Sequence, residues 1–233
     1  MDFKKHITFE NIYFTLSMVV LLVCGIVFKS TPFVLICSLL SMASNLLNAM
    51  TLKVSYIFSL VSSVMYSFSA LEQHYYGEFI FNLFILTPLF IYCIFRWFVP
   101  SQKKTAAAKG DVFSITPKAA VLFAIALGIV ILVYGYGLKL IGTHLPYANA
   151  CSTLFVLGAN FLGSRRMKEQ WYLFLGSNAF LIFLWVTAGQ DDLGNILYAI
   201  QNVLFIIGNV YGIFKWTRIS REEKKKKQQS QQD

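Results

Sequence analysis

The amino-acid sequence predicts an all-α membrane protein with eight transmembrane helices. Of its 233 residues, 57% are apolar and 13% are charged, whereas soluble domains carry about 25% charged residues. Eight apolar segments are long enough to cross a bilayer. The basic residues gather in alternate connections, as they do in membrane proteins with positive cytoplasmic loops. These observations argue against a soluble globular domain.

Each predicted span is close to the length of about 20 residues that a helix needs to cross the hydrocarbon core. The spans are residues 12–28, 33–52, 54–71, 79–98, 119–141, 146–163, 171–188 and 195–216. Turn residues or charges separate them, as in Lys-Ser-Thr-Pro at 29–32 and Gly-Thr-His-Leu-Pro at 142–146. The strands of a membrane barrel would alternate apolar and polar residues. These segments do not alternate, so helices are expected.

The charges in the connections predict that both termini are cytoplasmic. In this orientation all of the 20 Lys and Arg residues except Lys29 and Lys139 lie on the cytoplasmic side. The acidic residues of the opposite connections are Glu72, Glu78, Asp191 and Asp192. We therefore expect a multi-pass protein of the cell membrane, surrounded by the lipid bilayer. The net charge of +9 arises from the cytoplasmic connections and the tail, so no nucleic acid partner is expected.

An internal repeat predicts two three-helix units, residues 31–98 and 144–217. The matches are Tyr92-Cys-Ile-Phe-Arg-Trp97 with Tyr211-Gly-Ile-Phe-Lys-Trp216, Pro32 with Pro146, and Asn45 with Asn160, at offsets of 119, 114 and 115 residues. Chance could produce one such match, but a series in the same order indicates a duplicated unit.

The two units start four crossings apart, so they enter the membrane in the same direction and form parallel repeats. Sugar transporters of the SWEET type have this arrangement. Residues 119–143 supply the linker helix that parallel repeats require, after a cytoplasmic loop at 99–118. Residues 1–30 form an additional N-terminal transmembrane helix. Residues 218–233 are predicted to form a disordered basic tail, because they contain no apolar run to bury.

Polar side chains within the spans predict a path for a small molecule, because in lipid they face a partner helix or a wet cavity. Trp171, Phe174 and Asn178 follow one face of the seventh span, at steps of three and four residues. The other candidates are Tyr198, Gln201 and Asn202 on the eighth span, Asn160 on the sixth, and Asn45 and Asn82 in the first unit.

Alternative roles remain open for several of these side chains. Trp171 and Trp185, which share one helical face, also fit an interfacial aromatic belt. Asn45 and Asn160 equally fit hydrogen bonds between helices rather than contacts with a ligand.

The groups that the predicted spans lack limit the chemistry. No Asp or Glu is expected inside a span, which argues against coupling to protons or sodium. No glycine-rich phosphate loop indicates ATP hydrolysis. No Ser/His/Asp set, carboxylate pair or metal-ligand spacing indicates an enzyme or a cofactor. The expected ligand carries no phosphate, is neutral or singly cationic, planar and rich in hydrogen-bonding groups, and moves downhill.

Residues 165–178 read Arg-Arg-Met-Lys-Glu-Gln-Trp-Tyr-Leu-Phe-Leu-Gly-Ser-Asn, and with the closing Tyr211 to Trp216 they resemble the PnuC family of vitamin transporters. The resemblance extends over about residues 31–217. In the family a basic loop leads into Trp-x-x-Trp and then Asn or Asp, and here Phe174 replaces the second Trp. The resemblance implies that Trp171, Phe174 and Asn178 line the substrate site.

The PnuC resemblance also implies a SWEET-like core of three, one and three helices, assembled as a homotrimer. It implies facilitated diffusion of nicotinamide riboside, an NAD precursor, which cytosolic phosphorylation then traps. The alternatives are transport of thiamine or a deoxynucleoside, or a membrane subunit that binds a ligand without moving it. The complete set of candidate substrate-binding residues is Trp171, Phe174, Asn178, Asn160, Asn202, Gln201, Tyr198, Asn45, Asn82 and Tyr211.

Overall fold

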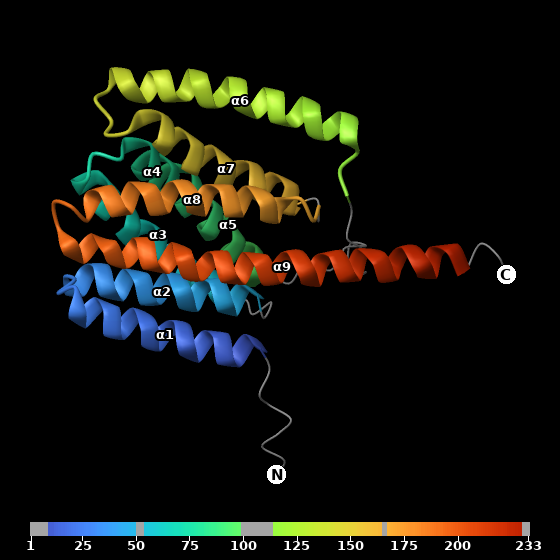
Figure 1. Ribbon diagram of the computed structural model, residues 1–233, viewed down its shortest axis with the longest axis horizontal. Coiled ribbons are helices and arrows are strands. Elements are labelled where there is room, and N and C mark those ends of the chain that lie inside the picture. Colours follow the sequence, from blue (N-terminus) through green and yellow to red (C-terminus); the bar gives the residue numbers. More distant parts are fainter. Residues whose placement is uncertain (1–8, 50–53, 99–113, 165–166, 230–233) are drawn as a thin grey trace, which may run out of the picture.

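The computed structural model describes residues 9–49, 54–98, 114–164 and 167–229, and within these ranges the chain folds into a bundle of helices (Figure 1). The α-helices are α1 (Phe9–Val27), α2 (Pro32–Ala49), α3 (Ser55–Glu72), α4 (Tyr76–Phe81), α5 (Thr87–Phe98), α6 (Pro117–Leu140), α7 (Pro146–Ser164), α8 (Gln170–Ala188) and α9 (Ile196–Gln229). A π-helix, η2 (Asn82–Leu86), joins α4 to α5, and a 3-10 turn, η4 (Leu193–Asn195), precedes α9.

Four stretches of helix are long and apolar enough to cross a membrane. They are Tyr76–Phe95, Pro117–Leu140, Gln170–Ala188 and Leu193–Arg218. Shorter apolar helices occupy Asn11–Val27 and Pro32–Asn45. α3 carries buried serines at 55, 62, 63, 67 and 69, so its hydropathy is lower although it lies inside the bundle. The all-helical class is confirmed, while the prediction of eight spans goes further than the four that length and hydropathy establish.

Prolines and a hydroxyl side chain set the starts of several helices. α2, α6 and α7 each begin at a proline, at residues 32, 117 and 146. Proline suits the first helical position because its φ angle is already helical and its missing N–H has no partner there. The Thr116 hydroxyl caps α6 by accepting a hydrogen bond from the Ala119 N–H at 3.4 Å. The predicted boundaries therefore agree with the structure to within a few residues at these helices.

The fourth predicted span begins earlier than expected and contains one wider turn. We predicted residues 79–98, but the helix starts at Tyr76 and continues through η2 into α5. The Thr87 hydroxyl donates to the Asn82 carbonyl at 2.9 Å within the π-helical turn. Pro88, which has no N–H, follows directly. As a consequence of the earlier start, Glu78 belongs to the first turn of a helix rather than to a connection.

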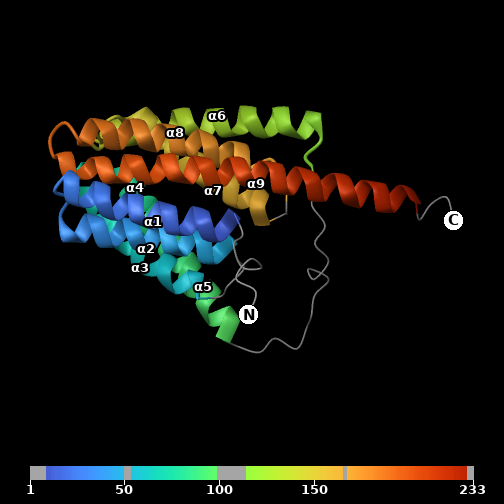
Figure 2. The same ribbon diagram turned by 60° about the horizontal axis from the view of Figure 1, so that its bottom comes forward.

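The helices pack as two neighbouring groups, which the contacts and two views describe together (Figures 1 and 2). α2 packs on α3, and α3 packs on α4 and α5. In the second group α8 packs on both α7 and α9. Two seams join the groups, α4 against α7 and α2 against α9. α6 leans on α7 at one edge, and α1 lies against α2 and α9 at the other.

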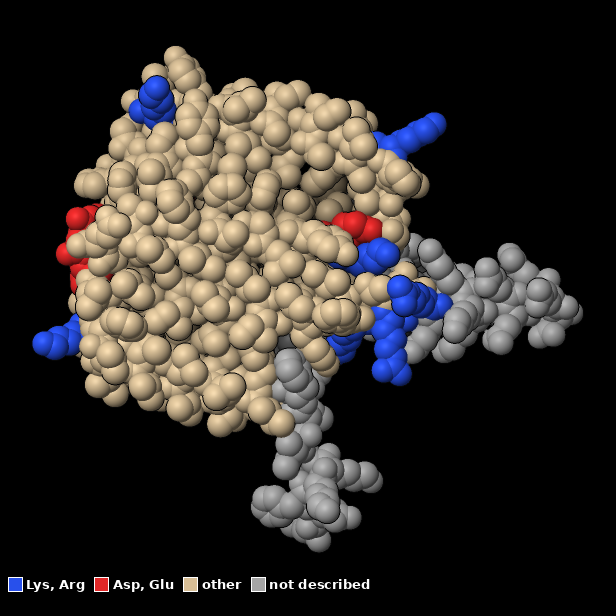
Figure 3. Space-filling model, in the orientation of Figure 1, with Lys and Arg blue, Asp and Glu red and all other residues tan. Residues whose placement is uncertain are grey.

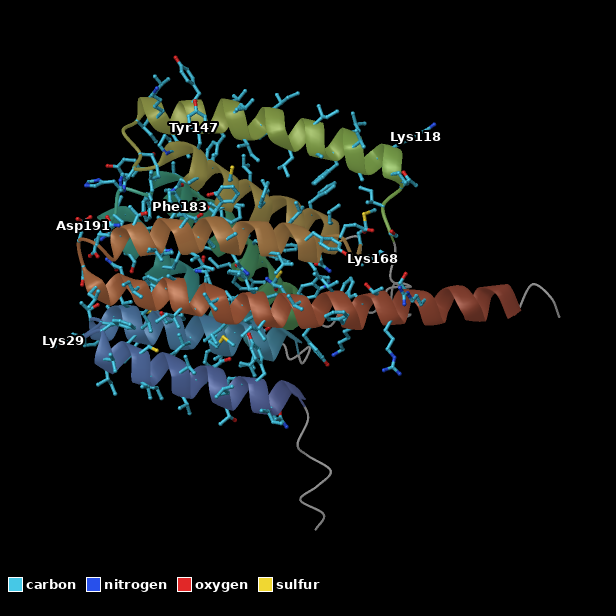
Figure 4. The ribbon with its side chains drawn as sticks, viewed as in Figure 1. Lys29, Lys118, Tyr147, Lys168, Phe183 and Asp191 are labelled. Atoms are coloured by element: carbon cyan, nitrogen blue, oxygen red, sulfur yellow. The ribbon has the colours of Figure 1, made fainter. Side chains whose placement is uncertain are left out.

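Charged residues in view lie at the two ends of the bundle, and the face between them is uncharged (Figure 3). Figure 4 places Asp191 and Lys29 at one end, and Lys118 and Lys168 at the other. We call these the Asp191 end and the Lys168 end. Between them, apolar side chains such as Leu122 (69% exposed) and Val133 (68% exposed) point outward. An uncharged band of this kind matches the hydrocarbon core of a bilayer.

α9 is longer than the span predicted for it. Its backbone remains helical to Gln229, so the prediction of a disordered tail from residue 218 is wrong for residues 218–229. Arg, Glu, Lys and Gln are good helix formers, which explains how a segment without apolar residues continues the helix. Residues 230–233 lie outside the described part of the chain, as do residues 99–113 of the predicted loop.

Candidate functional site

Two contacts fix the register of α8 against α9, which carry most of the predicted site residues. The Trp171 indole of α8 lies against Gly212 of α9. Further along, the rings of Trp185 and Tyr198 are 4.4 Å apart. The two partners on α8 are 14 residues apart, and so are the two on α9, so both contacts belong to one antiparallel register. The candidate residues can therefore be ordered by depth.

An aromatic group occupies the Lys168 end of this helix pair. The ring centroids of Trp171 and Phe174 are 6.1 Å apart, and those of Trp171 and Trp216 are 5.8 Å apart and nearly perpendicular. The half-buried Trp171 packs closely because Gly212 has no side chain. Its indole N–H is buried without a hydrogen-bond partner. The group thus presents aromatic faces and one unused donor.

Unpaired amide groups lie deeper in the same helix pair. Asn178 is 6% exposed, and its Nδ2 donor has no partner. Gln201 is 5% exposed, and its Oε1 acceptor has no partner. Asn178 lies about 10 Å along α8 from Trp171, and the register places Gln201 about 6 Å beyond Asn178. Buried amides normally find partners, so this unpaired donor and acceptor indicate a place for a ligand with both functions.

Three further candidates are buried but already hydrogen-bonded. The Asn202 amide donates to the Tyr198 carbonyl at 2.8 Å, and the Tyr198 hydroxyl shares a hydrogen bond of 2.8 Å with Ser69. The Asn82 amide donates to the Glu78 carbonyl at 2.8 Å, while its oxygen accepts from the Ser63 hydroxyl at 3.3 Å. These side chains line the interior, although their polar groups are mostly engaged.

Three candidates lie away from this interior. Asn45 and Asn160 are exposed, and the Asn160 amide donates to the Val156 carbonyl of its own helix at 2.8 Å. Tyr211 is half-buried, and the Lys215 ammonium lies 5.5 Å from its ring centroid. The structure therefore does not bring these three residues together with Asn178 and Gln201.

Glu78 corrects the expectation that no acidic residue lies inside a span. It is 4% exposed, and its carboxylate accepts hydrogen bonds from the hydroxyls of Ser152 and Thr153 on α7, the latter at 3.1 Å. The Asn82 amide lies 3.4 Å from the other carboxylate oxygen. The sequence-based placement of Glu78 in an outer connection was wrong because an acidic residue beside a glycine resembles a turn. Neutral donors from α7 allow it to be buried instead.

A second aromatic cluster closes the interior towards the Asp191 end. Trp185 is fully buried, so the interpretation as an interfacial belt residue is wrong for it. Its indole N–H donates to the Tyr66 hydroxyl at 2.8 Å, and it contacts the rings of Tyr75 and Tyr198 edge-on or tilted. The Tyr75 hydroxyl donates to the Leu184 carbonyl at 2.6 Å. Burial, together with the nearby Asp191 carboxylate, raises the pKa of Tyr75 to about 12, so this donor keeps its proton.

Sequence reasoning missed several interior residues, chiefly Glu78, Ser63 and Tyr66. For Ser63 and Tyr66 the signal that could have found them is the serine-rich face of α3, where serines at 55, 59, 62, 63, 67 and 69 are too numerous for a lipid-facing helix.

Comparison with known proteins now identifies the family. Residues 31–218 match the family described as nicotinamide mononucleotide transporter. The chain belongs to this family. A nicotinamide riboside transporter PnuC from Neisseria mucosa is 25% identical over 173 residues, which cover 71% of this chain and 64% of that protein. A nicotinamide riboside transporter PnuC from Haemophilus influenzae is 22% identical over 165 residues, covering 71% and 70%.

A solved structure supports the nicotinamide mononucleotide transporter fold. The crystal structure of the vitamin B3 transporter PnuC superimposes with a TM-score of 0.74, and the match covers 93% of each chain at 20% identity. At this identity the likeness establishes the shared fold. The matched region spans 64% of the length of the Neisseria relative, just under two thirds. Membership of a transporter family agrees with the predictions of a multi-pass membrane protein and of no enzymatic activity.

Proposed function

We propose that this protein is a facilitative transporter that takes up nicotinamide riboside, a precursor of NAD. The observation that carries this proposal is the order of groups along α8 and α9. The Trp171 and Phe174 rings would receive the planar nicotinamide ring. The unpaired Asn178 donor and Gln201 acceptor would then meet the carboxamide and ribose hydroxyls, which both donate and accept. Relatives named nicotinamide riboside transporters support the choice.

The buried charge favours the riboside over the phosphorylated mononucleotide in the family's name. Among the described residues, Glu78 is the charged side chain that is buried, and no Lys or Arg is buried beside it. A phosphate would be desolvated in the interior without a cation, and it would be repelled by the carboxylate. A riboside avoids both penalties, and phosphorylation after entry would trap it in the cytosol.

The proposal includes an architecture of eight spans, in which a linker helix joins two parallel three-helix units. In each unit a hydrogen bond joins the first helix to the second at a sequence separation of 25, which supports it. In the first unit the Cys37 thiol of α2 donates to the Ser62 carbonyl of α3 at 3.5 Å. In the second unit the donor is on the second helix, where the Ser177 hydroxyl of α8 donates to the Ser152 carbonyl of α7 at 3.0 Å. The Lys168 end would face the cytoplasm with both termini, as positive charge favours. A homotrimer remains part of the proposal through the resemblance.

We propose downhill transport, although one of its premises has changed. Glu78 is an ionisable group inside the candidate span Tyr76–Phe95 of the structure, so the absence of such groups no longer argues against proton coupling. The sequence still offers no nucleotide-binding loop for an ATP-driven step. A proton gradient imposed across proteoliposomes tests the mechanism. Uncoupled transport equilibrates nicotinamide riboside at the same level with and without the gradient, and gradient-dependent accumulation would refute it.

Uptake of labelled nicotinamide riboside by proteoliposomes tests the substrate. Trp171→Ala and Asn178→Ala should each weaken binding by about 1–3 kcal/mol if these side chains contact the substrate. Asn160→Ala is the matched control, because this amide is exposed and bonds within its own helix. Saturable uptake of thiamine or a deoxynucleoside in place of nicotinamide riboside would reject the substrate. Saturable binding without uptake would identify a ligand-binding subunit instead.

A further inference from the structure

Glu78 is held at the seam between the two helix groups by contacts on both its backbone and its side chain. Its N–H donates to the Asn149 side-chain oxygen of α7 at 3.0 Å. Its carboxylate accepts from the hydroxyls of Ser152 and Thr153. Gly77 allows this close approach, because a Cβ at that position would overlap the Asn149 oxygen. The carboxylate position is therefore fixed by α7 rather than by its own helix alone.

The protein supplies this carboxylate with hydrogen bonds but with no opposite charge. From α7 it meets the neutral side chains of Ser152 and Thr153. The ionisable side chains that interact with it from α3 and α6 are the phenols of Tyr66 and Tyr134. No buried Lys or Arg occurs in the part of the chain that the structure describes. A cation that arrives from outside would favour the ionised form of this carboxylate, because the protein itself supplies no opposite charge.

Tyr66 belongs to the buried aromatic cluster and also interacts electrostatically with the Glu78 carboxylate. Its ring centroid is 5.5 Å from that of Trp185 and 5.4 Å from that of Tyr198. The faces of tryptophan and tyrosine rings attract cations through their quadrupoles. An interior that holds both a carboxylate and such rings suits an organic cation whose charge is spread over a planar ring.

The second unit shows that the fold does not require a carboxylate at this position. Asn82 and Asn202 each donate to the carbonyl four residues earlier, at 2.8 Å, and those carbonyls belong to Glu78 and Tyr198. Glu78 faces α7 across one seam, while the Tyr198 hydroxyl interacts with Cys37 of α2 across the other. One seam thus holds a phenol where the other holds a carboxyl group. Packing alone does not explain the charge.

We propose that Glu78 is a specificity-determining residue that makes the transporter prefer a positively charged heterocycle over a neutral one of the same shape. This inference rests on the proposed function, and it concerns how the same path selects its substrate. The ring nitrogen of nicotinamide riboside carries the positive charge. The charge of thiamine lies on its thiazolium ring, whereas deoxynucleosides are neutral.

Nicotinamide riboside and benzamide riboside form the test pair. They share the ribose and the carboxamide, and they differ in that carbon replaces the charged ring nitrogen. Binding of both is measured to the purified wild-type protein, to Glu78→Gln and to Glu78→Asp. Glu72→Gln is the matched control, because it removes the same charge from an exposed position at the Asp191 end. A monodisperse elution profile and an unchanged melting temperature identify correctly folded variants.

Wild-type protein should bind nicotinamide riboside more tightly than benzamide riboside. Glu78→Gln should reduce this preference by roughly 15- to 30-fold, as expected for one charge pair at about 8–10 Å in an effective dielectric of about 20. Glu78→Asp and Glu72→Gln should retain it. Should Glu78→Gln fail to fold, Glu78→Met, which keeps the length of the side chain without its charge, provides the second neutral variant.

The outcomes separate this inference from the proposed function. Equal wild-type binding of both ribosides, or an equal loss for both in the neutral variants, overturns the role of Glu78 and leaves riboside transport standing. Failure of wild-type protein to bind nicotinamide riboside overturns the proposed substrate itself. In that case, binding of thiamine and of its neutral thiazole-ring reduction product is measured on the same variants. A preference for thiamine that is lost in Glu78→Gln supports selection of charge by Glu78, and equal binding of the two compounds overturns it.

Discussion

The contact between Trp171 and Gly212 gives the sharpest prediction. A Cβ added at Gly212 would lie 2.8 Å from each of three indole atoms, Cδ2, Cε2 and Cε3, whereas ordinary contacts are 3.4–4 Å. These atoms form the rigid centre of the ring, so the whole indole must shift. Overpacking costs about 1–3 kcal/mol, and replacing helical glycine by alanine returns about 1 kcal/mol. Gly212→Ala should therefore destabilise the protein by about 0–2 kcal/mol.

The displaced indole should also weaken substrate binding. Loss of part of an aromatic contact is worth about 1 kcal/mol, which corresponds to a roughly fivefold higher Kd for nicotinamide riboside. Melting in detergent and direct binding are measured on the same preparations. Gly128→Ala in α6 is the matched control, because nothing lies within 4 Å of its added Cβ. This control should be stabilised by about 0.5–1 kcal/mol and should bind normally.

A double variant decides whether the cause is the indole. In a Trp171→Ala background the obstacle is gone, so Gly212→Ala should no longer destabilise the protein and should behave as Gly128→Ala does. If Gly212→Ala is equally destabilising with and without Trp171, or has wild-type stability and affinity on its own, the packing argument is refuted.

Three further predictions concern other contacts. Gly77→Ala should destabilise the protein by about 1–3 kcal/mol in thermal unfolding, because its Cβ would overlap the Asn149 oxygen that anchors α4 to α7; a melting temperature equal to that of Gly128→Ala would contradict this. Tyr66→Phe should cost about 1–3 kcal/mol, because it leaves the buried Trp185 N–H without its acceptor; unchanged stability would mean that another acceptor replaces it. Asn160→Ala should change stability by less than about 0.5 kcal/mol and leave uptake at the wild-type level, and a loss of uptake would return this exposed amide to the substrate path.

Helix positions were predictable because hydropathy and turn residues determine them directly. Pro32, Pro117 and Pro146 each begin a helix, where the missing N–H carries no penalty. The start of α4 was missed because residues 75–78, Tyr-Tyr-Gly-Glu, combine a glycine with an acidic residue and therefore resemble a turn. Only the tertiary contacts with α7, which are distant in sequence, make that turn helical and buried.

Side-chain direction was less predictable than helix position. Asn45 and Asn160 correspond by the repeat, yet both are exposed, because residue type alone does not distinguish the two sides of a span. Asn178 was identified by its place on an aromatic face, and it is buried with an unused donor. The prediction for residues 218–229 was wrong because their polar composition was taken as a sign of disorder. The same residues are good helix formers, and the preceding part of α9 already provides the nucleus from which the helix continues.

The length of α9 has a mechanical consequence. Its 34 residues form one uninterrupted helix, about 51 Å long, and Figure 1 shows its C-terminal part projecting beyond the other helices. A rigid rod amplifies rotation, so a tilt of about 10° around the η4 end would move Gln229 by roughly 9 Å. A pair of spectroscopic labels, one near Gln229 and one on α6, would therefore convert small movements of α9 within the bundle into readily measured changes in distance.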